Sequence, residues 1–318
     1  MMDSGGLRIA VVGVGAVGGY FGGRLLQAGE SVSFVARGKT LRALRANGLR
    51  LESPQGNAVL SNLEATDSPV EIGAVDVVIV AVKAWQVPGI AESIHPLVGR
   101  DTVILPLQNG VEAADQLAAV CGKERVLGGI CRIVAAADGE GHVKHVGVEP
   151  FIALGELDNH RSSRTARLVE TLRRAGIAAD NPADIQASIW KKFLFIAPVS
   201  GVAAVARAPL GVIRAIPETR SLVEQAMGEV SDLARSKRIS LSAHSMRKTL
   251  EFLDTMPAES TCSMQRDIMG GRPSELDAIN GAVVRLGRVL GIDTPVNQFI
   301  HASLLPTEVK AREVESAR

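Results

Sequence analysis

The chain has 318 residues, of which 46% are hydrophobic and 22% are charged, and its formal net charge is +1. That length is enough for two domains, and the composition is typical of an ordinary globular protein. The small net charge and the aromatic content of only 3% argue against a nucleic-acid or membrane partner.

Cysteine usage and the N-terminal residues predict a cytoplasmic protein. The three cysteines are odd in number and have no C-x-x-C spacing, which is typical of reduced thiols. Residues 1–6 lack the basic start of a signal peptide, and no uninterrupted apolar run is long enough to span a membrane. We expect no metal site, because His142 and His145 would point to opposite faces of a strand and no third ligand is visible.

A glycine-rich turn joins the first predicted strand to the first predicted helix. Residues 7–12 form an apolar run short enough for a buried strand, and residues 16–28 have a helical pattern. Gly13, Gly15 and Gly18 have the spacing G-x-G-x-x-G, which in this context allows a tight turn, the approach of a pyrophosphate and close helix packing. Free N–H groups at the helix start attract phosphates. The predicted dinucleotide-binding residues are Gly13, Val14, Gly15, Ala16, Val17 and Gly18.

The second predicted strand, residues 31–35, ends beside cations rather than beside an acid. NAD-type sites usually carry Asp or Glu at this point for the ribose hydroxyls. Here Arg37 and Lys39 follow the strand, and Arg37 can stack on adenine and pair with a 2′-phosphate. We therefore predict NADP(H) as the cofactor. The alternative is a solvated basic loop, because Arg and Lys are mostly exposed.

Two further predicted strands deliver polar residues at their ends. Residues 76–82 lead to Lys83, and residues 102–107 lead to Asn109. In a doubly wound sheet, ligands bind outside the carboxyl ends of the strands. The glycine turn, Arg37, Lys83 and Asn109 are therefore expected at one edge of the sheet, although Lys83 could equally be a solvated strand-end cation.

The rest of the N-terminal half is predicted to complete this sheet. Three short apolar segments, residues 130–135, 142–145 and 151–154, are separated by glycine-rich turns, and we expect them to extend the sheet as antiparallel members. The other elements predicted here are helices at 40–46, 111–120 and 164–175, a hairpin at 48–60 and a strand at 177–179.

Turn residues at 181–184 mark the predicted domain boundary, which divides the chain into 1–181 and 182–318. Beyond it only helical patterns occur. The predicted class is therefore an α/β protein, with an N-terminal Rossmann-type doubly wound sheet followed by an all-α C-terminal domain. The charged residues from about Glu308 onward are expected to fray. The predicted helices are 185–206, interrupted by Pro198, and 217–237, 242–256, 278–290 and 295–305, with a polar segment at 260–267.

Several motifs, in their order along the chain, make it similar to the ketopantoate reductase (2-dehydropantoate 2-reductase) family. The resemblance runs from Leu7 to about Leu305. It implies the NADPH-dependent reduction of a 2-oxo acid to a 2-hydroxy acid, most simply 2-dehydropantoate to pantoate in pantothenate biosynthesis. The motifs are the GVGAVG turn, Arg37, Lys83-Ala84-Trp85-Gln86, Asn109-Gly110, Trp190-Lys191-Lys192, Cys262-Ser263-Met264 with Asp267, and Glu275-Leu276-Asp277 with Ile279-Asn280-Gly281.

The resemblance also implies roles for individual residues and an active site between the two domains. Lys192 would be the general acid, because an ammonium stabilises the charge that develops on a carbonyl oxygen and supplies the proton. Burial or a neighbouring cation can lower the pKa of a lysine for this task. The alternatives are a solvated helix cation for Lys192 and a helix-entry carboxylate for Glu275. Lys83, Asn109 and Glu275 would lie along the nicotinamide and ribose, and the implied substrate-binding residues are Lys192, Ser263, Asn109 and Ser200.

The chain departs from the family pattern in its substrate pocket. The family usually carries asparagines four and eight residues after the catalytic lysine, whereas this chain has Ile196 and Ser200. These positions share one helix face with Lys192. A more apolar 2-oxo acid is therefore an alternative substrate, and a non-catalytic NADP(H)-binding redox sensor is a rival function. The apolar helices of the C-terminal half are compatible with a homodimer.

Overall fold

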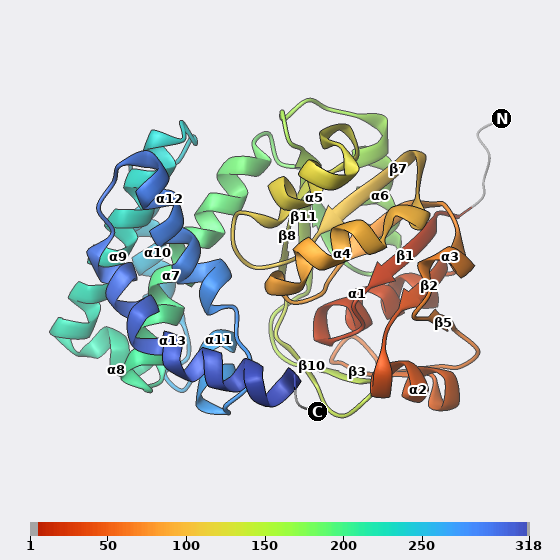
Figure 1. Ribbon diagram of the computed structural model, residues 1–318, viewed down its shortest axis with the longest axis horizontal. Helices are drawn as coiled ribbons and strands as arrows, with labels where there is room; N and C mark the ends of the chain where they lie inside the picture. The colour runs from red at the N-terminus through yellow and green to blue at the C-terminus, as the bar shows by residue number, and fades with distance from the viewer. Residues whose placement is uncertain (1–5, 317–318) are drawn as a thin grey trace. The chain divides into compact units, whose positions relative to one another are not determined.

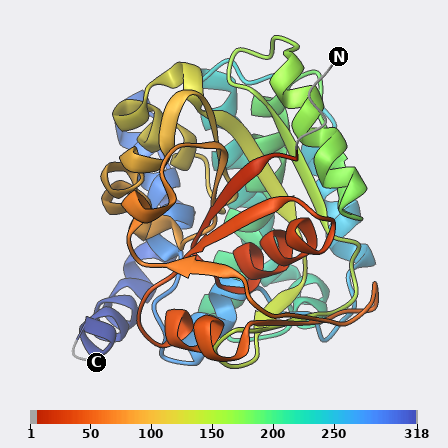
Figure 2. The same ribbon diagram turned by 90° about the vertical axis from the view of Figure 1, so that its right-hand side faces the viewer.

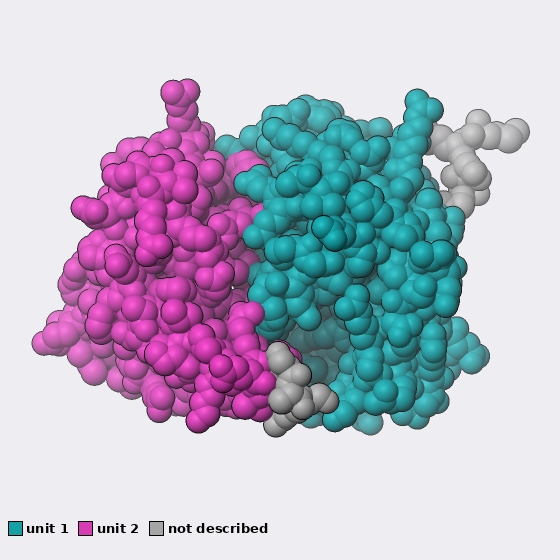
Figure 3. Space-filling model, viewed as in Figure 1, with its two compact units in different colours: residues 1–108, 113–185 teal, residues 109–112, 186–318 magenta. Residues whose placement is uncertain are grey.

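The computed structural model describes residues 6–316, and the chain divides into two compact units (Figure 3). Unit 1 comprises residues 1–108 and 113–185, and unit 2 comprises residues 109–112 and 186–318. The predicted boundary after residue 181 lies four residues before the division at 185/186, and residues 109–112, which prediction assigned to the N-terminal domain, belong to unit 2. The expectation of no signal peptide rests on the first six residues, of which 1–5 lie outside the described part of the chain.

A five-stranded parallel sheet, in the order β5-β2-β1-β6-β7, forms the centre of unit 1. All its neighbouring strands pair in parallel. Its strands are β1 (Arg8–Val12), β2 (Ser31–Val35), β5 (Glu64–Thr66), β6 (Val75–Val80) and β7 (Val98–Pro106). The first two strands agree closely with prediction, whereas β6 ends two residues before the predicted end at Val82.

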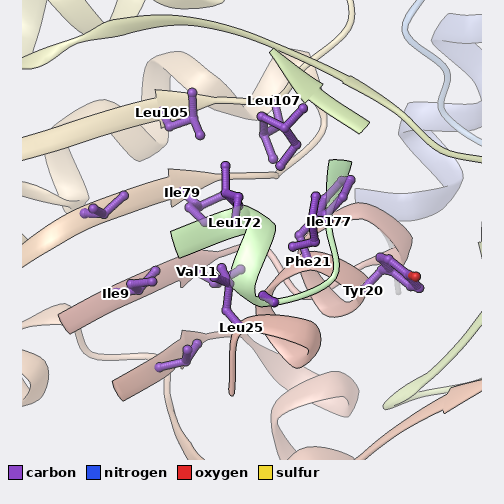
Figure 4. Close-up of a cluster of buried hydrophobic side chains, with 14 of the residues drawn as sticks. Ile9, Val11, Tyr20, Phe21, Leu25, Ile79, Leu105, Leu107, Leu172 and Ile177 are labelled. Carbon is purple, nitrogen blue, oxygen red and sulfur yellow. The ribbon is translucent and has the colours of Figure 1, made fainter. Parts of the chain in front are cut away.

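Both faces of this sheet are buried, as a doubly wound fold requires. Along β1, Ile9 and Val11 belong to one apolar cluster while Ala10 and Val12 belong to a second. Helices α1 (Ala16–Gln27) and α6 (Ser163–Arg174) contribute to the first cluster (Figure 4), and α4 (Val87–Ser93) and α5 (Ala113–Cys121) contribute to the second. Figure 2 shows helices on both sides of the sheet. The short helices of the unit are α2 (Gly38–Asn47), α3 (Pro69–Ile72), η1 (Ala84–Gln86), η2 (His95–Leu97) and η3 (Lys123–Arg125).

The prediction that three later strands extend the main sheet is wrong. β9 and β10 join the hairpin β3–β4 in a four-stranded sheet, and β8, β11 and β12 form a three-stranded sheet. One isolated bridge, Ile104 to Val126, links β7 to the segment before β8. The bounds are β3 (Leu49–Glu52), β4 (Ala58–Leu60), β8 (Leu127–Arg132), β9 (Ala135–Ala137), β10 (His142–His145), β11 (Phe151–Glu156) and β12 (Ala178–Asp180).

Two glycines of α1 explain where the four-stranded sheet packs. A Cβ at Gly19 would lie 2.8 Å from the Val143 side chain, and one at Gly23 would lie 2.8 Å from the Leu51 side chain. Both distances are shorter than real Cβ contacts. The glycine face of α1 therefore admits this sheet at close range, which the pattern of short strands alone does not show.

The described residues of unit 2 form helices joined by turns and loops and contain no strand, which confirms the predicted class. The two helices missed by prediction, α8 and α11, have six and seven residues and are too short to show a clear period. The helices are α7 (Ile185–Ala206), α8 (Leu210–Ala215), α9 (Pro217–Ser236), α10 (Ser245–Thr255), α11 (Ser263–Met269), the π-helical turn η4 (Asp277–Gly281), α12 (Ala282–Leu290) and α13 (Pro295–Ser316) (Figure 1).

Helix α7 is largely apolar, with Lys191 and Lys192 as its two charged residues, as expected of a mostly buried helix. Among the described helices it alone is long and apolar enough to cross a membrane by length and composition, but 67% of that stretch is buried inside the protein. Buried amides hold α7 to its neighbours: Asn280 Nδ2 donates to Ala197 O at 3.1 Å and to Asn297 Oδ1 at 2.8 Å. Asn297 Nδ2 in turn donates to the Glu229 carboxylate at 2.6 Å. This chain of hydrogen bonds connects α7, η4, α13 and α9.

The expected fraying from Glu308 is wrong, because α13 continues to Ser316. Glu308 is only 3% exposed, and its carboxylate accepts the backbone N–H of Ser274 at 2.9 Å and the Ser274 hydroxyl at 2.6 Å. The Arg312 side chain donates to the same carboxylate at 2.7 Å. Because these contacts bury the Glu308 carboxylate and satisfy its hydrogen bonds, the helix stays intact at this position.

We expect Glu308→Ala to lower the free energy of unfolding by about 2–3 kcal/mol, because it leaves buried donors of Ser274 without an acceptor. Glu313→Ala is the matched control on the same helix, since Glu313 is exposed, and it should change stability by less than about 0.5 kcal/mol. Urea denaturation followed by circular dichroism measures both. Equal losses in the two variants would contradict the structural role of Glu308.

Candidate active site

The glycine turn between β1 and α1 has the geometry that its spacing predicts. Gly13 has φ +95°, and a Cβ there would lie 2.7 Å from the backbone nitrogen of Val82. A Cβ at Gly18 would lie 2.0 Å from the carbonyl oxygen of Gly13. At Gly15, in contrast, a Cβ would meet nothing within 4 Å. Gly13 and Gly18 therefore allow the backbone to pack closely at these two positions, whereas the space next to Gly15 is open.

The N-terminus of α1 faces this open space without a side-chain cap. Gly15 is the N-cap residue and offers no side chain, and no acid lies in the first turn. The first helical bond runs from Gly19 N to Gly15 O at 2.8 Å. The N–H groups of Ala16, Val17 and Gly18 come before this bond and have no intrahelical acceptor. They can bind phosphate oxygens, so the turn fits a dinucleotide.

Arg37 lies at the end of the strand next to this turn. Val12 of β1 pairs with Val35 of β2, and Gly13 N donates to Val35 O at 3.0 Å. Arg37 follows as the N-cap residue of α2, and its side chain is exposed, as is that of Lys39. The parallel register thus places Arg37 at the same edge of the sheet as the glycine turn.

Lys83 follows β6 at the same edge, in a loop that Gln108 holds. Gln108 is buried, and its Nε2 donates to Val80 O at 2.9 Å and to Val82 O at 3.0 Å. Gln86 accepts the Lys83 N–H at 3.1 Å, and Lys83 Nζ lies 5.8 Å from the centroid of the Trp85 ring. Trp85 and Gln86 of the tetrad therefore support the lysine. Gln108 is a residue to which the sequence analysis assigns no role.

Asn109 and Glu275 are brought together, although 166 positions separate them. Asn109 Nδ2 donates to Glu275 Oε2 at 2.9 Å, and Glu275 is only 8% exposed. Gly110 follows with φ +101°, and a Cβ there would lie 2.7 Å from Ala278 O. The side chains of Asn109 and Glu275, two of the implied cofactor-binding residues, are therefore in contact within unit 2.

An ion-pair cluster fixes the segment 109–112 to unit 2. Arg285 donates to Glu112 Oε2 at 2.7 Å and to Asp277 Oδ1 at 2.7 Å. His301, with Nε2 3.6 Å from Asp277 Oδ1, and the guanidinium of Arg285 lower the pKa of Asp277 to about 2. The carboxylate of Asp277 is therefore charged across the physiological range. Glu112, Arg285 and His301 are not predicted from the sequence, because no spacing signal joins residues so far apart.

Lys192, Ile196 and Ser200 lie one turn apart along α7, on one face of the helix. Lys192 and Ile196 are half-buried, and Ser200 is only 3% exposed. Burial raises the pKa of the Cys262 thiol, and the Ser200 side chain opposes this with a smaller effect. Cys262 comes directly before the exposed Ser263 at the start of α11. Residues 6–316 contain no group of three or more His, Cys, Asp or Glu placed to hold a metal ion.

The chain is similar in sequence and in structure to known proteins of one family. A family model described as "Ketopantoate reductase PanE/ApbA" matches residues 9–159, and one described as "Ketopantoate reductase PanE/ApbA C terminal" matches residues 184–308. The chain is 32% identical over 298 residues to the "Uncharacterized oxidoreductase YkpB" of Bacillus subtilis, which covers 94% of this chain and 98% of that protein.

Relatives with assigned names point to the same family. The chain is 32% identical over 310 residues to a 2-dehydropantoate 2-reductase of Mesorhizobium japonicum, covering 91% of this chain and 94% of the relative. A crystal structure of 2-dehydropantoate 2-reductase from Geobacter metallireducens superposes with a TM-score of 0.88 at 33% identity, over 94% of this chain and 99% of the other. The resemblance predicted from the motifs is thus confirmed, and the chain belongs to the ketopantoate reductase family of oxidoreductases.

Proposed function

We propose that this protein reduces a 2-oxo acid to a 2-hydroxy acid with NADPH, and that 2-dehydropantoate, a precursor in pantothenate biosynthesis, is the leading substrate. The observation that carries the proposal is that the family match spans residues 9–159 and 184–308 and so includes every residue to which the resemblance gives a role. A cytoplasmic location, a homodimeric state and the lack of nucleic-acid or membrane partners remain expectations of this proposal.

The residues present fit a nicotinamide dinucleotide with a 2′-phosphate. The open space at Gly15 and the uncapped start of α1 suit the pyrophosphate. The exposed Arg37, at a position where NAD-type sites carry an acid, suits the 2′-phosphate. Lys83 and the hydrogen-bonded pair of Asn109 and Glu275 would lie along the nicotinamide and its ribose. When bound, NADPH supplies the hydride to the carbonyl carbon of the substrate.

Lys192 carries the acid chemistry of the proposal. Negative charge develops on the carbonyl oxygen as the carbon is reduced, and the ammonium group at Lys192 Nζ stabilises that charge. The same group then gives its proton to the oxygen, which completes the hydroxyl. The half-buried position of Lys192 on the apolar α7 strengthens this electrostatic effect relative to water. Ser263, exposed at the start of α11, is the proposed hydrogen-bonding partner of the substrate.

A more apolar 2-oxo acid is the second candidate substrate, and the face of α7 beyond Lys192 favours it. Ile196 cannot form a side-chain hydrogen bond, and Ser200 is only 3% exposed and carries a hydroxyl in place of an amide. This face thus lacks the amide groups that the family usually offers to a hydroxylated substrate. An NADPH-oxidation assay with a panel of 2-oxo acids separates the two candidates. Binding of NADPH without turnover of any acid would instead favour the redox-sensor alternative.

The first prediction of this proposal concerns the cofactor. Arg37→Ala should raise the KM for NADPH about tenfold or more, because one charge-assisted contact to the 2′-phosphate is lost, while the KM for NADH stays nearly constant. Lys39→Ala, two residues away and also exposed, is the matched control and should have a smaller effect. Equal losses for both cofactors would refute the role of Arg37.

The second prediction concerns the general acid. Lys192→Ala should lower kcat by about 10²- to 10⁴-fold, the range expected for a positioned acid, and should largely keep NADPH affinity. Lys191→Ala is the adjacent control, since Lys191 is exposed, and it should retain activity. A small loss of kcat accompanied by a large drop in unfolding temperature would show that Lys192 is structural.

The third prediction concerns substrate choice. If 2-dehydropantoate is the natural substrate, the double variant Ile196→Asn with Ser200→Asn should raise kcat/KM for it. If the natural substrate is more apolar, the same change should lower activity on that substrate about tenfold or more, because each buried unsatisfied amide costs about 1–3 kcal/mol. The assay compares 2-dehydropantoate with a deoxy analogue of similar size. A wild-type preference for 2-dehydropantoate of about 10³-fold or more would exclude the apolar substrate.

A further inference from the structure

An open pocket of about 400 Å³ lies in unit 1 at the C-terminal ends of α1 and α6, beside the turn of the β3–β4 hairpin. The side chains of Arg24, Gln27, Gln55 and Arg174 line it, together with small residues such as Ala28 and Ala175. A pocket of this size suits a small metabolite. No residue of the proposed active site belongs to its lining.

Arg24 is a buried cation for which the described residues provide no carboxylate partner. It is only 6% exposed, and its guanidinium donates to Gln27 Oε1 at 2.9 Å and to Gly56 O at 2.7 Å. The guanidinium also stacks 5.2 Å from the Tyr20 ring centroid. An arginine has five N–H donors, and no acceptor among the described residues meets the buried Nε–H. Because buried charges are normally paired, this guanidinium is suited to an anion that binds in the pocket.

The other polar side chains of the pocket also present donors. The amide oxygen of Gln27 accepts from Arg24, and that of Gln55 accepts from the Tyr20 hydroxyl at 2.8 Å. Their NH₂ groups are therefore the ends left for a ligand. Arg174 is half exposed and donates to Glu30 Oε1 at 3.0 Å. Glu30 and the exposed Glu170 face Arg174 from outside the lining, so no acid lines the pocket itself.

We propose that this pocket binds a small molecule that carries an oxyanion, either a phosphate or a carboxylate. The oxyanion accepts hydrogen bonds from Arg24, Arg174 and the amides of Gln27 and Gln55, and the rest of the ligand lies against Ala28 and Ala175. The site is separate from the dinucleotide turn, because it lies at the opposite end of α1. A helix of 12 residues is about 18 Å long.

Isothermal titration at constant ionic strength tests the proposal, with inorganic phosphate and malonate as the two probes. We expect one saturable site for at least one probe, which identifies the ligand as phosphate-like or carboxylate-like. Saturating NADPH should leave this binding unchanged. Arg24→Lys keeps the positive charge but removes the planar guanidinium group with its several N–H donors, and Arg174→Gln removes an exposed positive charge. Each should weaken the preferred probe about tenfold or more, since charge-assisted hydrogen bonds are lost.

Two further variants distinguish binding of the probe in the pocket from non-specific attraction of an anion to the positive charges of α6. Ala28→Leu fills space at an exposed position while it keeps both arginines, and it should also weaken binding. Arg167→Gln is the matched control, because Arg167 is an exposed residue of α6 outside the lining, and it should bind like the wild type. The proposal is overturned if neither probe binds, if NADPH abolishes binding, or if Arg167→Gln weakens binding as much as Arg174→Gln.

Discussion

Parallel pairing of β1 with β2 on one side and β6 on the other brings Val12 into register with Val35 and with Val80. Everything proposed for the dinucleotide depends on this alignment, because the residues that follow three different strands then emerge at one edge. The close approach of α1 to β1 at Gly18 is part of the same constraint. A side chain at Gly18 would collide with the turn and move the start of the helix away from it.

The segment from Gln108 to Glu112 joins this edge to the helical unit. Gln108 anchors in unit 1 through the carbonyls of Val80 and Val82, while the next residue, Asn109, bonds to Glu275 in unit 2. Arg285 then holds Glu112. One short stretch of chain therefore carries a residue that supports the Lys83 loop, followed directly by a residue that contacts Glu275.

Buried polar contacts shape unit 2 more than its apolar pattern suggests. Glu229 and Glu308 are carboxylates with almost no exposure, and each accepts backbone N–H groups as well as side-chain donors. Such groups are costly to bury unless fully bonded. Their bonds fix where α13 begins and where the Ser274 segment lies. The position of Glu275 thus depends on Glu308, and that of α7 depends on Asn280 and Asn297.

The sequence by itself determined the local elements and the resemblance to a family. Strand length, glycine spacing and apolar period identify β1, α1 and α7, and Arg37 stands out by residue type, because these signals are contained in neighbouring residues. The role of Lys192, in contrast, is implied only by the resemblance, since a lysine on a helix is by itself most simply a solvated cation. Only the tertiary structure decided the contacts between distant positions. It placed β10 on the glycine face of α1 rather than in the main sheet, buried Glu308, joined Arg285 to Glu112 and gave Arg24 no carboxylate partner among the described residues. The physical reason is that such pairings depend on which surfaces the fold brings within hydrogen-bond or van der Waals distance, and no local pattern records that distance.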